Sequence, residues 1–346
     1  MNDRALSLLE QYDIEVLRTR KGRGTFICDT KQGSLVFQEY SGNPEKLNFQ
    51  QVLLKRIKEL DLVKSEELIP NREGQLFVRD GDGVCYILKT YFEGNECDIY
   101  DSRQCAEAIQ LLARLHHCMD DMELPTGLLP AYSPLQEYEK HNRELTRAWS
   151  YLKKKGQKQV FEMRLSGVIE YFIWQARQVT ESWKQLERSE ESDYTKGAAQ
   201  PQIVGTSGQS VRPAKPAVGI CHGDYQYHNI LHCQDGWRII NFEKLKQDDP
   251  IQDVYLFLRK VMEKNHWPVY QGLDLLEAYE AIRNLNEYSK KDLYHRFAYP
   301  EKFWKIVNFY YNAPKAWIPE KNLEKLEKVI CQEKAKMLFL KEAFLK

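Results

Sequence analysis

The sequence predicts an α+β fold with two lobes, a small β-rich lobe followed by a large and mostly helical one. The chain has 346 residues, more than one ordinary hydrophobic core holds. Residues 1–92 alternate short β-like runs with one amphipathic segment, whereas helical periodicity dominates from residue 101 onward. We therefore expect an N-terminal lobe over residues 1–92 and a helical C-terminal lobe over residues 93–346.

The first lobe is predicted to be a hairpin, a helix and a second hairpin. Gly33 separates the strands of the first hairpin, and the turn Asp80-Gly81-Asp82-Gly83 separates those of the second. Apolar spacing predicts helices over residues 5–12 and 45–60. The segments typical of strands are residues 24–29, 34–40, 75–79 and 84–91.

The second lobe is predicted to be helical, with one interruption. Ser102 is placed to cap the first of its helices. Residues 188–217 are rich in Ser, Gly, Pro and Ala, which predicts a flexible insertion. The predicted helices are residues 102–117, 134–155, 160–186 and several from 251 onward, the last being 319–346.

Composition excludes several classes of protein. Lys plus Arg and Asp plus Glu number 50 each, and this balance argues against a nucleic-acid binder. The eight cysteines form no C-x-x-C pair and no zinc spacing, so we expect neither zinc nor haem. The N-terminus lacks the apolar core of a signal peptide, and no apolar run could span a bilayer. We expect a cytoplasmic protein without a transmembrane segment.

The chemistry is predicted to lie on the loop over residues 221–231, between two strands. Asp224 and Asn229 are five residues apart there and can point into one cleft. Asp224 can accept a proton from a substrate hydroxyl, and Asn229 can bind Mg²⁺ on the phosphates of ATP. A carboxylate that holds the metal normally follows on the next strand, here residues 237–243.

These residues carry a resemblance to a known superfamily. His222-Gly223-Asp224 with Asn229 resembles the H-G-D-x-x-x-x-N loop of aminoglycoside phosphotransferases and choline kinases. Residues 112–116 (LARLH) are similar to the helix end that precedes this loop. The resemblance covers residues 15–265 and implies a bilobal, protein kinase-like fold. It also implies that His222 supports the loop and that Asp253 caps a helix and braces the loop.

A narrower resemblance, to the CotS family of spore coat proteins, extends over nearly the whole chain. It implies a spore-forming Firmicute, a location in the mother-cell cytoplasm and then the spore coat, and other coat proteins as partners. The segments that carry it are residues 10–14 (EQYDI), 37–42 (FQEYSG), 93–97 (EGNEC), 241–244 (NFEK), 258–264 (LRKVMEK), 299–305 (YPEKFWK) and 315–319 (KAWIP).

The chain departs from the kinase pattern at two positions. Asn241 stands where the metal strand normally has Asp, which should weaken metal binding because an amide brings no charge. Gln38 stands where the small lobe normally has a phosphate-anchoring Lys, so its expected helix partner, Glu45, lacks a cation. We therefore expect nucleotide and Mg²⁺ binding to be weak or lost.

Two further features of the small lobe resemble parts of a nucleotide site. Residues 85–89 superficially resemble the V-A-I-K strand of kinases, but we expect Lys89 to lie on the connection between the lobes and not to anchor phosphates. Gly22 and Gly24 can cover phosphates through backbone N–H groups, and a plain hairpin turn explains them at least as well.

Two functions remain open at this stage. The first is a spore coat protein whose kinase-like scaffold acts in assembly. The alternative is an active ATP- and Mg²⁺-dependent phosphotransferase. It would act on a small-molecule hydroxyl, in a sugar, a choline-like alcohol or an aminoglycoside, or on other coat proteins. The many aromatic residues are expected to pack mostly inside, with a minority exposed for assembly among Phe303, Trp304, Phe309, Tyr310, Tyr311 and Trp317.

Overall fold

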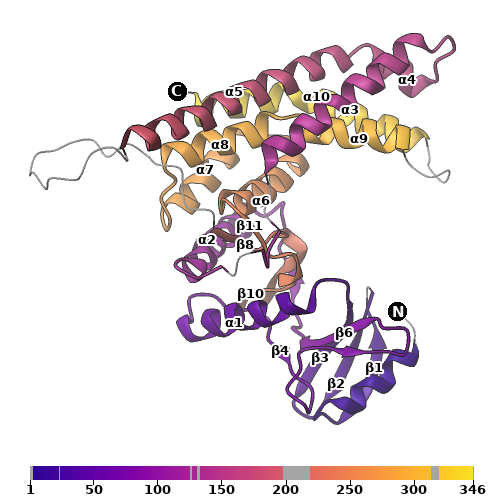
Figure 1. The fold of residues 1–346 in the computed structure, drawn as a ribbon, viewed down its shortest axis with the longest axis vertical. Helices are drawn as coiled ribbons and strands as arrows, with labels where there is room; N and C mark the ends of the chain where they lie inside the picture. Colours follow the sequence, from indigo (N-terminus) through magenta and orange to yellow (C-terminus); the bar gives the residue numbers. More distant parts are fainter. Residues whose placement is uncertain are drawn as a thin grey trace, which may run out of the picture. The chain divides into compact units, whose positions relative to one another are not determined.

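The computed structural model describes residues 3–22, 24–124, 127–130, 133–197, 219–312 and 319–345 (Figure 1). The described residues form two compact units. Unit 1 lies within Met1–Ala131, Val218–Phe257 and Ala278–Arg283, and unit 2 within Tyr132–Ala217, Leu258–Glu277 and Asn284–Lys346. The expected lobe boundary at residue 92 therefore lies inside unit 1. The predicted α+β class is confirmed, with an N-terminal sheet and a larger helical part.

Unit 1 begins with an antiparallel sheet whose order is β1-β2-β3-β6-β4, with β5 also paired to β6. Its strands are β1 (Val16–Lys21), β2 (Thr25–Thr30), β3 (Gly33–Tyr40), β4 (Leu68–Ile69), β5 (Val78–Arg79) and β6 (Cys85–Thr90). Strand β1 was not expected. All of its side chains after Val16 are exposed, so no period-two apolar pattern marks it.

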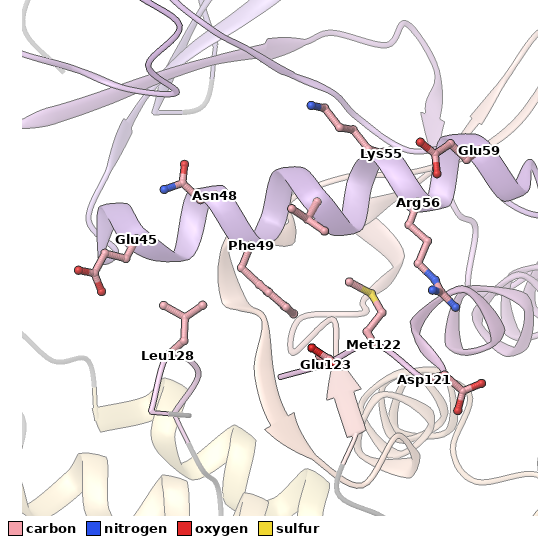
Figure 2. A pocket seen from close by; sticks show the side chains of 11 residues that line it. Glu45, Asn48, Phe49, Lys55, Arg56, Glu59, Asp121, Met122, Glu123 and Leu128 are labelled. Atoms are coloured by element: carbon pink, nitrogen blue, oxygen red, sulfur yellow. The ribbon is translucent and has the colours of Figure 1, made fainter. Parts of the chain in front are cut away.

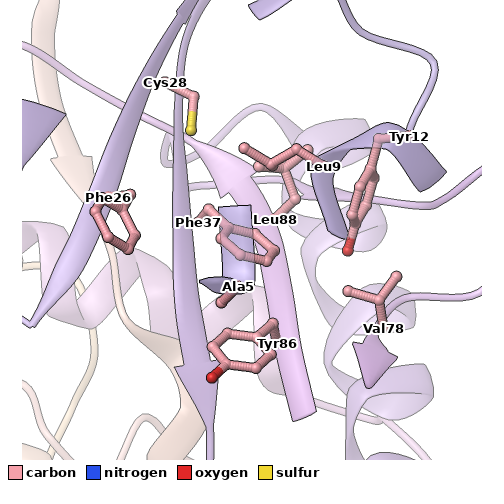
Figure 3. Close-up of a cluster of buried hydrophobic side chains, with 9 residues drawn as sticks. All are labelled: Ala5, Leu9, Tyr12, Phe26, Cys28, Phe37, Val78, Tyr86 and Leu88. Carbon is pink, nitrogen blue, oxygen red and sulfur yellow. The ribbon is translucent and has the colours of Figure 1, made fainter. Parts of the chain in front are cut away.

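Packing in the core of this sheet determines the face from which Gln38 and Lys89 project. A 3₁₀-helix, η1 (Asp3–Gln11), packs on one face, where Phe37 of β3 stacks on Tyr86 of β6 with ring centroids 5.3 Å apart. Because neighbouring residues of a strand point to opposite faces, Gln38 and Lys89 must project from the other face. The buried cluster drawn in Figure 3 is Ala5, Leu9, Tyr12, Phe26, Cys28, Phe37, Val78, Tyr86 and Leu88.

Helix α1 (Pro44–Leu60) follows β3, and its two ends are well defined. The side chain of Asn43 accepts a hydrogen bond from the Glu45 backbone N–H, and Pro44 occupies the first helical position, where its missing N–H costs nothing. The helix ends at Asp61, which adopts the left-handed conformation. The buried face includes Leu47, Phe49, Leu53, Leu54 and Ile57.

The rest of unit 1 holds the predicted catalytic-type loop. Helix α2 (Ser102–Met119) starts one residue before the expected arrangement. Asp101, and not Ser102, is the N-cap, because its carboxylate accepts from the backbone N–H groups of Arg103 and Gln104. The short elements around the loop are β7 (Asn95–Glu96), β8 (Gly219–Cys221), η2 (Tyr227–Asn229), β9 (Ile230–Cys233), β10 (Gly236–Ile239), η3 (Phe242–Lys244) and β11 (Lys246–Asp248).

Unit 2 is helical. The predicted helix over residues 160–186 is two helices, because the helical conformation is interrupted at Gly167. The second of them runs to Gly197, and the remainder of the expected insertion up to residue 217 lies outside the described residues. The helices are α3 (Pro134–Lys154), α4 (Val160–Ser166), α5 (Ile169–Gly197), α8 (Glu287–Ala298), α9 (Glu301–Asn312) and α10 (Pro319–Phe344), while α6 (Ile251–Lys264) and α7 (Val269–Glu280) contribute to both units.

Aromatic packing accounts for much of unit 2. Tyr138 stacks on Tyr299 with centroids 3.7 Å apart, and Trp304 stacks on His141 while donating its indole N–H to Glu144. Of the residues proposed for an exposed surface, Phe303 is buried and Phe309 is exposed, whereas Trp317 lies outside the described residues. Within the described ranges, the helices include none that is long and apolar enough to cross a membrane.

Candidate functional site

The loop that carries Asp224 is held in place by a buried carboxylate. Asp253, in the first turn of α6, accepts hydrogen bonds from the backbone N–H groups of His222 at 2.7 Å and Gly223 at 2.9 Å. Nε2 of His116 lies 3.4 Å from the same carboxylate. Burial would raise the pKa of Asp253, but the interactions with His116, His222 and Gly223 outweigh it and hold the pKa below its usual value. Asp253 is therefore an anionic brace of the loop.

His222 is a structural part of the loop. Its Nδ1 accepts a hydrogen bond from the backbone N–H of Asp224 at 3.2 Å, so the proton is on Nε2, which donates to the Ile240 carbonyl at 3.1 Å. Burial lowers the pKa of His222, so the ring stays neutral. Both ring nitrogens are used inside the protein, which leaves His222 no role as a base.

Gly223 is required by the geometry of the turn. Its φ is +78°, and a Cβ atom at this position would lie 2.0 Å from the carbonyl oxygen of Lys244. Only a residue without a side chain permits this close approach of two backbone segments. The turn before Asp224 therefore depends on glycine at this position.

Asp224 is held by two side chains. Gln226 Nε2 donates to its Oδ1 at 2.7 Å, and Lys244 Nζ lies 2.8 Å from its Oδ2. The Asp224 side chain is 13% exposed, whereas Lys244 is 67% exposed. An ion pair with so exposed a lysine is weak and exchanges readily. A hydroxyl could therefore reach Asp224 if Lys244 moved away.

The two predicted metal ligands bind each other. Asn241 adopts a left-handed backbone conformation with φ 67°, which Asn tolerates better than most residues. Its Nδ2 donates to Oδ1 of Asn229 at 2.7 Å, and Nδ2 of Asn229 donates to the Asp224 carbonyl at 2.8 Å. The oxygen of Asn229 thus already accepts a hydrogen bond from within the protein.

Lys89 lies in this site, and the expectation that it is on the connection between the lobes is wrong. It is the fifth residue of β6 and is only 2% exposed. Its Nζ donates to Asn241 Oδ1 at 2.7 Å and to Glu243 Oε1 at 2.6 Å, and it lies 3.0 Å from Glu66 Oε2. Burial would lower the pKa of Lys89, but the two carboxylates outweigh it and raise the pKa, so the side chain is a buried cation.

Glu66 is brought to this point by a short parallel contact. Ser65 forms a β-bridge with Ile239, the last residue of β10, and the Glu66 backbone N–H donates to the Ile239 carbonyl at 3.2 Å. The Glu66 carboxylate in turn accepts from the Phe242 backbone N–H at 3.1 Å. The segment after α1 and the segment after β10 are therefore locked together beside Lys89.

The remaining predicted nucleotide residues do not form the expected pair. Gln38 donates to Glu243 Oε1 at 2.9 Å, in the segment after β10. Glu45 is exposed and lies at a separate hollow beside α1, together with Phe49 and Leu128 (Figure 2). The cation that α1 contributes is the next residue, Lys46, which donates to the Glu243 carbonyl at 2.9 Å. The assignment of Glu45 as the helix partner is wrong because that side chain points to solvent.

The glycines of the first hairpin lie apart from this network. The Gly22 backbone N–H donates to the Thr25 carbonyl at 2.8 Å, and Gly24 has a φ of +73°. These are the features of a tight turn between β1 and β2. Whether the turn contacts phosphates stays a prediction.

Sequence reasoning missed the charged members of the site, Glu66 and Glu243, and misplaced Lys89. One signal was present. Residues 85–90 form a strand buried on both faces, and a lysine in such a strand must find a partner for its charge. No comparable signal marks Glu66, whose position depends on the bridge between Ser65 and Ile239.

The donor set at this point does not fit a divalent cation as it stands. Mg²⁺ takes oxygen ligands at about 2.1 Å and prefers carboxylates. Here each of the two amide oxygens already accepts one hydrogen bond, that of Asn229 from Asn241 and that of Asn241 from the Lys89 ammonium. An ion bound to Asn241 Oδ1 would lie within about 5 Å of Nζ, where like charges repel. In the described part of the chain, moreover, no group of three or more His, Cys, Asp or Glu could hold a metal ion.

Comparison with solved structures identifies the class of fold. An aminoglycoside phosphotransferase from Alicyclobacillus acidocaldarius matches with a TM-score of 0.79 and 16% identity, over 97% of this chain and 93% of that one. The AMP-bound spectinomycin phosphotransferase APH(9)-Ia matches with a TM-score of 0.61 and 13% identity, over 96% of this chain and 97% of that one. A microcompartment-associated aminopropanol kinase matches with a TM-score of 0.60 and 13% identity, over 99% of this chain and 98% of that one. The fold is thus the kinase-like fold of aminoglycoside phosphotransferases.

The family follows from the sequence match. The model of the phosphotransferase enzyme family (APH) matches residues 20–294, most of the chain. The chain belongs to this family. The predicted superfamily is thereby confirmed, and the match includes the catalytic-type loop, Lys89 and Asp253. A comparison with curated proteins gives no match.

Proposed function

We propose that this protein is a non-catalytic member of the phosphotransferase family that acts as an assembly scaffold of the CotS type in the spore coat. The observation that carries the non-catalytic part is the closed network of Lys89, Asn241 and Asn229. In it, every side-chain oxygen expected to bind the metal already accepts a hydrogen bond from the protein. A nucleotide would find neither a metal nor a free lysine there.

The coat role rests on different support. The segments that resemble CotS proteins run from residue 10 to residue 319 and include NFEK over residues 241–244. A scaffold also needs exposed surface for partners. Tyr171 and Trp174 on α5 are 45% and 59% exposed, with ring centroids 6.4 Å apart. Exposed aromatic side chains of this kind are enriched where proteins bind one another.

The first test is a thermal-shift titration of the purified protein with ATP and Mg²⁺, beside Asp224→Ala. Ligand binding to the native state raises the melting temperature by mass action. We expect no Mg²⁺-dependent rise in either protein. A rise in the wild type that the variant loses would overturn the non-catalytic proposal.

The second test addresses the coat role separately. A fluorescent fusion expressed from the native promoter in a sporulating host should accumulate at the coat. The Asp224→Ala fusion should accumulate equally, because a scaffold does not need the carboxylate. Diffuse fluorescence of the wild-type fusion throughout sporulation would refute the coat role and leave the first test unaffected.

A small-molecule kinase is the second candidate, and the placement of Asp224 favours it. The loop is braced by Asp253, and the Asp224 carboxylate is held by Gln226 and by the exposed Lys244. The spectinomycin phosphotransferase that shares the fold was solved with AMP bound. If this chain is active, Asp224 accepts the proton of the acceptor hydroxyl. Transfer of the γ-phosphoryl group from ATP to the hydroxyl of an amino alcohol or aminoglycoside, detected as ADP and phosphorylated acceptor and abolished by Asp224→Asn, would establish that function.

A further inference from the structure

We propose that the ammonium group of Lys89 is a resident cation that replaces the metal of this site, and that a divalent-cation site is latent beneath it. The inference rests on the proposed function in one respect, since both require that the wild-type site takes no divalent cation. It goes further, because it assigns the absence of divalent-cation binding to Lys89 and not to the missing carboxylate at Asn241.

The first step is the coordination of Lys89. An ammonium group has three N–H donors. Three oxygen atoms from three side chains lie within 3.0 Å of Nζ, and those side chains belong to Asn241, Glu243 and Glu66. Two of these oxygens, on Asn241 and Glu243, accept hydrogen bonds from Nζ, and Glu66 Oε2 completes the set as an ion-pair contact, so the ammonium is already committed to side chains of the protein. Its surroundings resemble those of a bound cation: three oxygen atoms, two of them from carboxyl groups, with the Lys89 and Glu66 side chains buried and that of Glu243 20% exposed.

The second step is the direction of the amides. An ammonium group only donates, so it fixes the oxygen of Asn241 toward Lys89 and its Nδ2 toward Asn229. The Asn229 oxygen then has to accept, and its own Nδ2 donates to the Asp224 carbonyl. Lys89 thus fixes the chain of amides from one end, and the Asp224 carbonyl, which only accepts, fixes it from the other. Removing the ammonium would leave the Asn241 oxygen without its donor.

The third step is charge. Glu66 and Glu243 supply two carboxylates beside one ammonium, and the side chain of Glu66 is only 1% exposed. Without Lys89 these carboxylates would lie close together with no cation between them. Carboxylate and amide oxygens are the ligands that Mg²⁺ and Mn²⁺ prefer. A divalent cation is therefore the natural replacement for the lysine.

The experiment measures Mn²⁺ binding by electron paramagnetic resonance and by the shift in melting temperature, without nucleotide. The proteins are the wild type, Lys89→Ala, Asn241→Asp and the control Lys46→Ala. Lys46 is a buried lysine of α1 that donates to the Glu243 backbone carbonyl. We expect one Mn²⁺ bound by Lys89→Ala, at least tenfold more tightly than by the wild type. We expect no gain in Lys46→Ala or in Asn241→Asp.

The Asn241→Asp variant separates the proposal from the simpler view that only a carboxylate is missing. If that variant binds Mn²⁺ while Lys89 is present, the ammonium does not block the site and the proposal fails. It fails equally if the wild type already binds Mn²⁺ as tightly as Lys89→Ala. Should Lys89→Ala not fold alone, refolding it with and without Mn²⁺ decides. Recovery only with the metal supports a latent site, and no recovery in either condition counts against it.

These outcomes can be told apart from failure of the proposed function. Loss of coat localisation would leave the Mn²⁺ result standing. Conversely, phosphorylation of an acceptor by the wild type without Mn²⁺ or Mg²⁺ would end the non-catalytic proposal but agree with a resident cation. The inference itself is overturned by Mn²⁺ binding in a protein that retains Lys89, or by a folded Lys89→Ala that binds no Mn²⁺.

Discussion

The amide nitrogen of Asn241 lies 2.7 Å from the amide oxygen of Asn229, so the two side chains expected to share a metal are hydrogen-bonded to each other. The oxygen of Asn241 faces Lys89 at the same distance of 2.7 Å. The departure from the kinase pattern is therefore more than the loss of one charge. Lys89 of β6 lies in the site and donates a hydrogen bond to the oxygen that a metal would need.

Restoring the two family residues should not restore the site. Gln38→Lys with Asn241→Asp returns the expected lysine and carboxylate, but Lys89 remains between Glu66 and Glu243. We expect no Mg²⁺-dependent rise in melting temperature with millimolar ATP. Adding Lys89→Ala to the same pair should produce such a rise in melting temperature. The corresponding gain in the free energy of unfolding is about 2.7 kcal/mol when the ligand is at 100 times its Kd. A response of the double variant equal to that of the triple variant would contradict this reasoning.

The brace under the loop should be the most sensitive polar position of unit 1. Asp253→Asn removes a charge that accepts two backbone N–H groups and adjoins His116, and it turns an N–H₂ group toward one of those donors. We expect a loss of about 3 kcal/mol in the free energy of unfolding, since bonds to charged groups are worth about 1.5–3 kcal/mol. Urea denaturation and amide exchange at His222 and Gly223 measure it.

The matched control is Asp82→Asn in an exposed turn. It makes the same chemical change at a carboxylate that solvent reaches, and it should cost under about 0.5 kcal/mol. Equal losses in the two variants, or unchanged exchange at the loop amides, would show that Asp253 does not hold the loop.

The sequence could predict what is local and periodic. The helices over residues 45–60 and 134–155 match α1 and α3 closely because their apolar spacing and capping residues are continuous in the chain. The position of Asp224 and Asn229 between two strands was also predicted, because a short motif determines the local geometry. Helix α5 extends beyond its predicted end because a polar segment can continue a helix without an apolar face to mark it.

The charged centre of the site could not be predicted in the same way. Lys89 and Glu243 are 154 residues apart, and they meet only because β6 and the segment after β10 converge. Glu66 reaches them through a single parallel bridge between Ser65 and Ile239. Such a bridge has no signature in composition or period. The general rule that a buried lysine needs a carboxylate partner would have pointed to a pair, but not to which residues form it.

Gly223 and Gly74 offer a test that separates strain from steric overlap. Their φ values are nearly equal, +78° and +80°, but a Cβ at Gly223 would meet the Lys244 carbonyl oxygen at 2.0 Å, whereas at Gly74 nothing lies within 4 Å. Gly74→Ala should cost about 1–2 kcal/mol, the price of a left-handed L-residue. Gly223→Ala should cost several kcal/mol more and displace the loop.

Thermal and urea unfolding of the two alanine variants give this difference directly. A crystal structure of Gly223→Ala should in addition show a shifted peptide at Lys244. If both variants lose the same stability, the close approach at Gly223 relaxes without cost, and the turn does not depend on contact with that carbonyl.

Unit 2 should show a pH dependence that originates at His295. Its ring is 4% exposed, stacks on Trp183 and has Nε2 2.9 Å from the Ser182 hydroxyl. Burial lowers its pKa to about 4, and the positive charge of Lys291 acts in the same direction, while a backbone hydrogen bond at Lys291 opposes both. In the unfolded chain the pKa is about 6.5. Between these values the unfolded state binds more protons, so stability rises with pH over this range and is lost as the pH falls.

Substituting His295→Gln removes this titration and keeps a polar side chain near Ser182. The variant should be less stable than the wild type at pH 7.5, because the ring no longer stacks on Trp183. Between pH 6.5 and pH 5 the wild type should lose about 2 kcal/mol more than the variant, since each unit of pKa difference is worth about 1.4 kcal/mol. His116, His141 and His222 are also buried, but they are common to both proteins and cancel in the difference. Urea unfolding at these pH values measures it, and parallel curves for the two proteins would mean that His295 accepts its proton without unfolding unit 2.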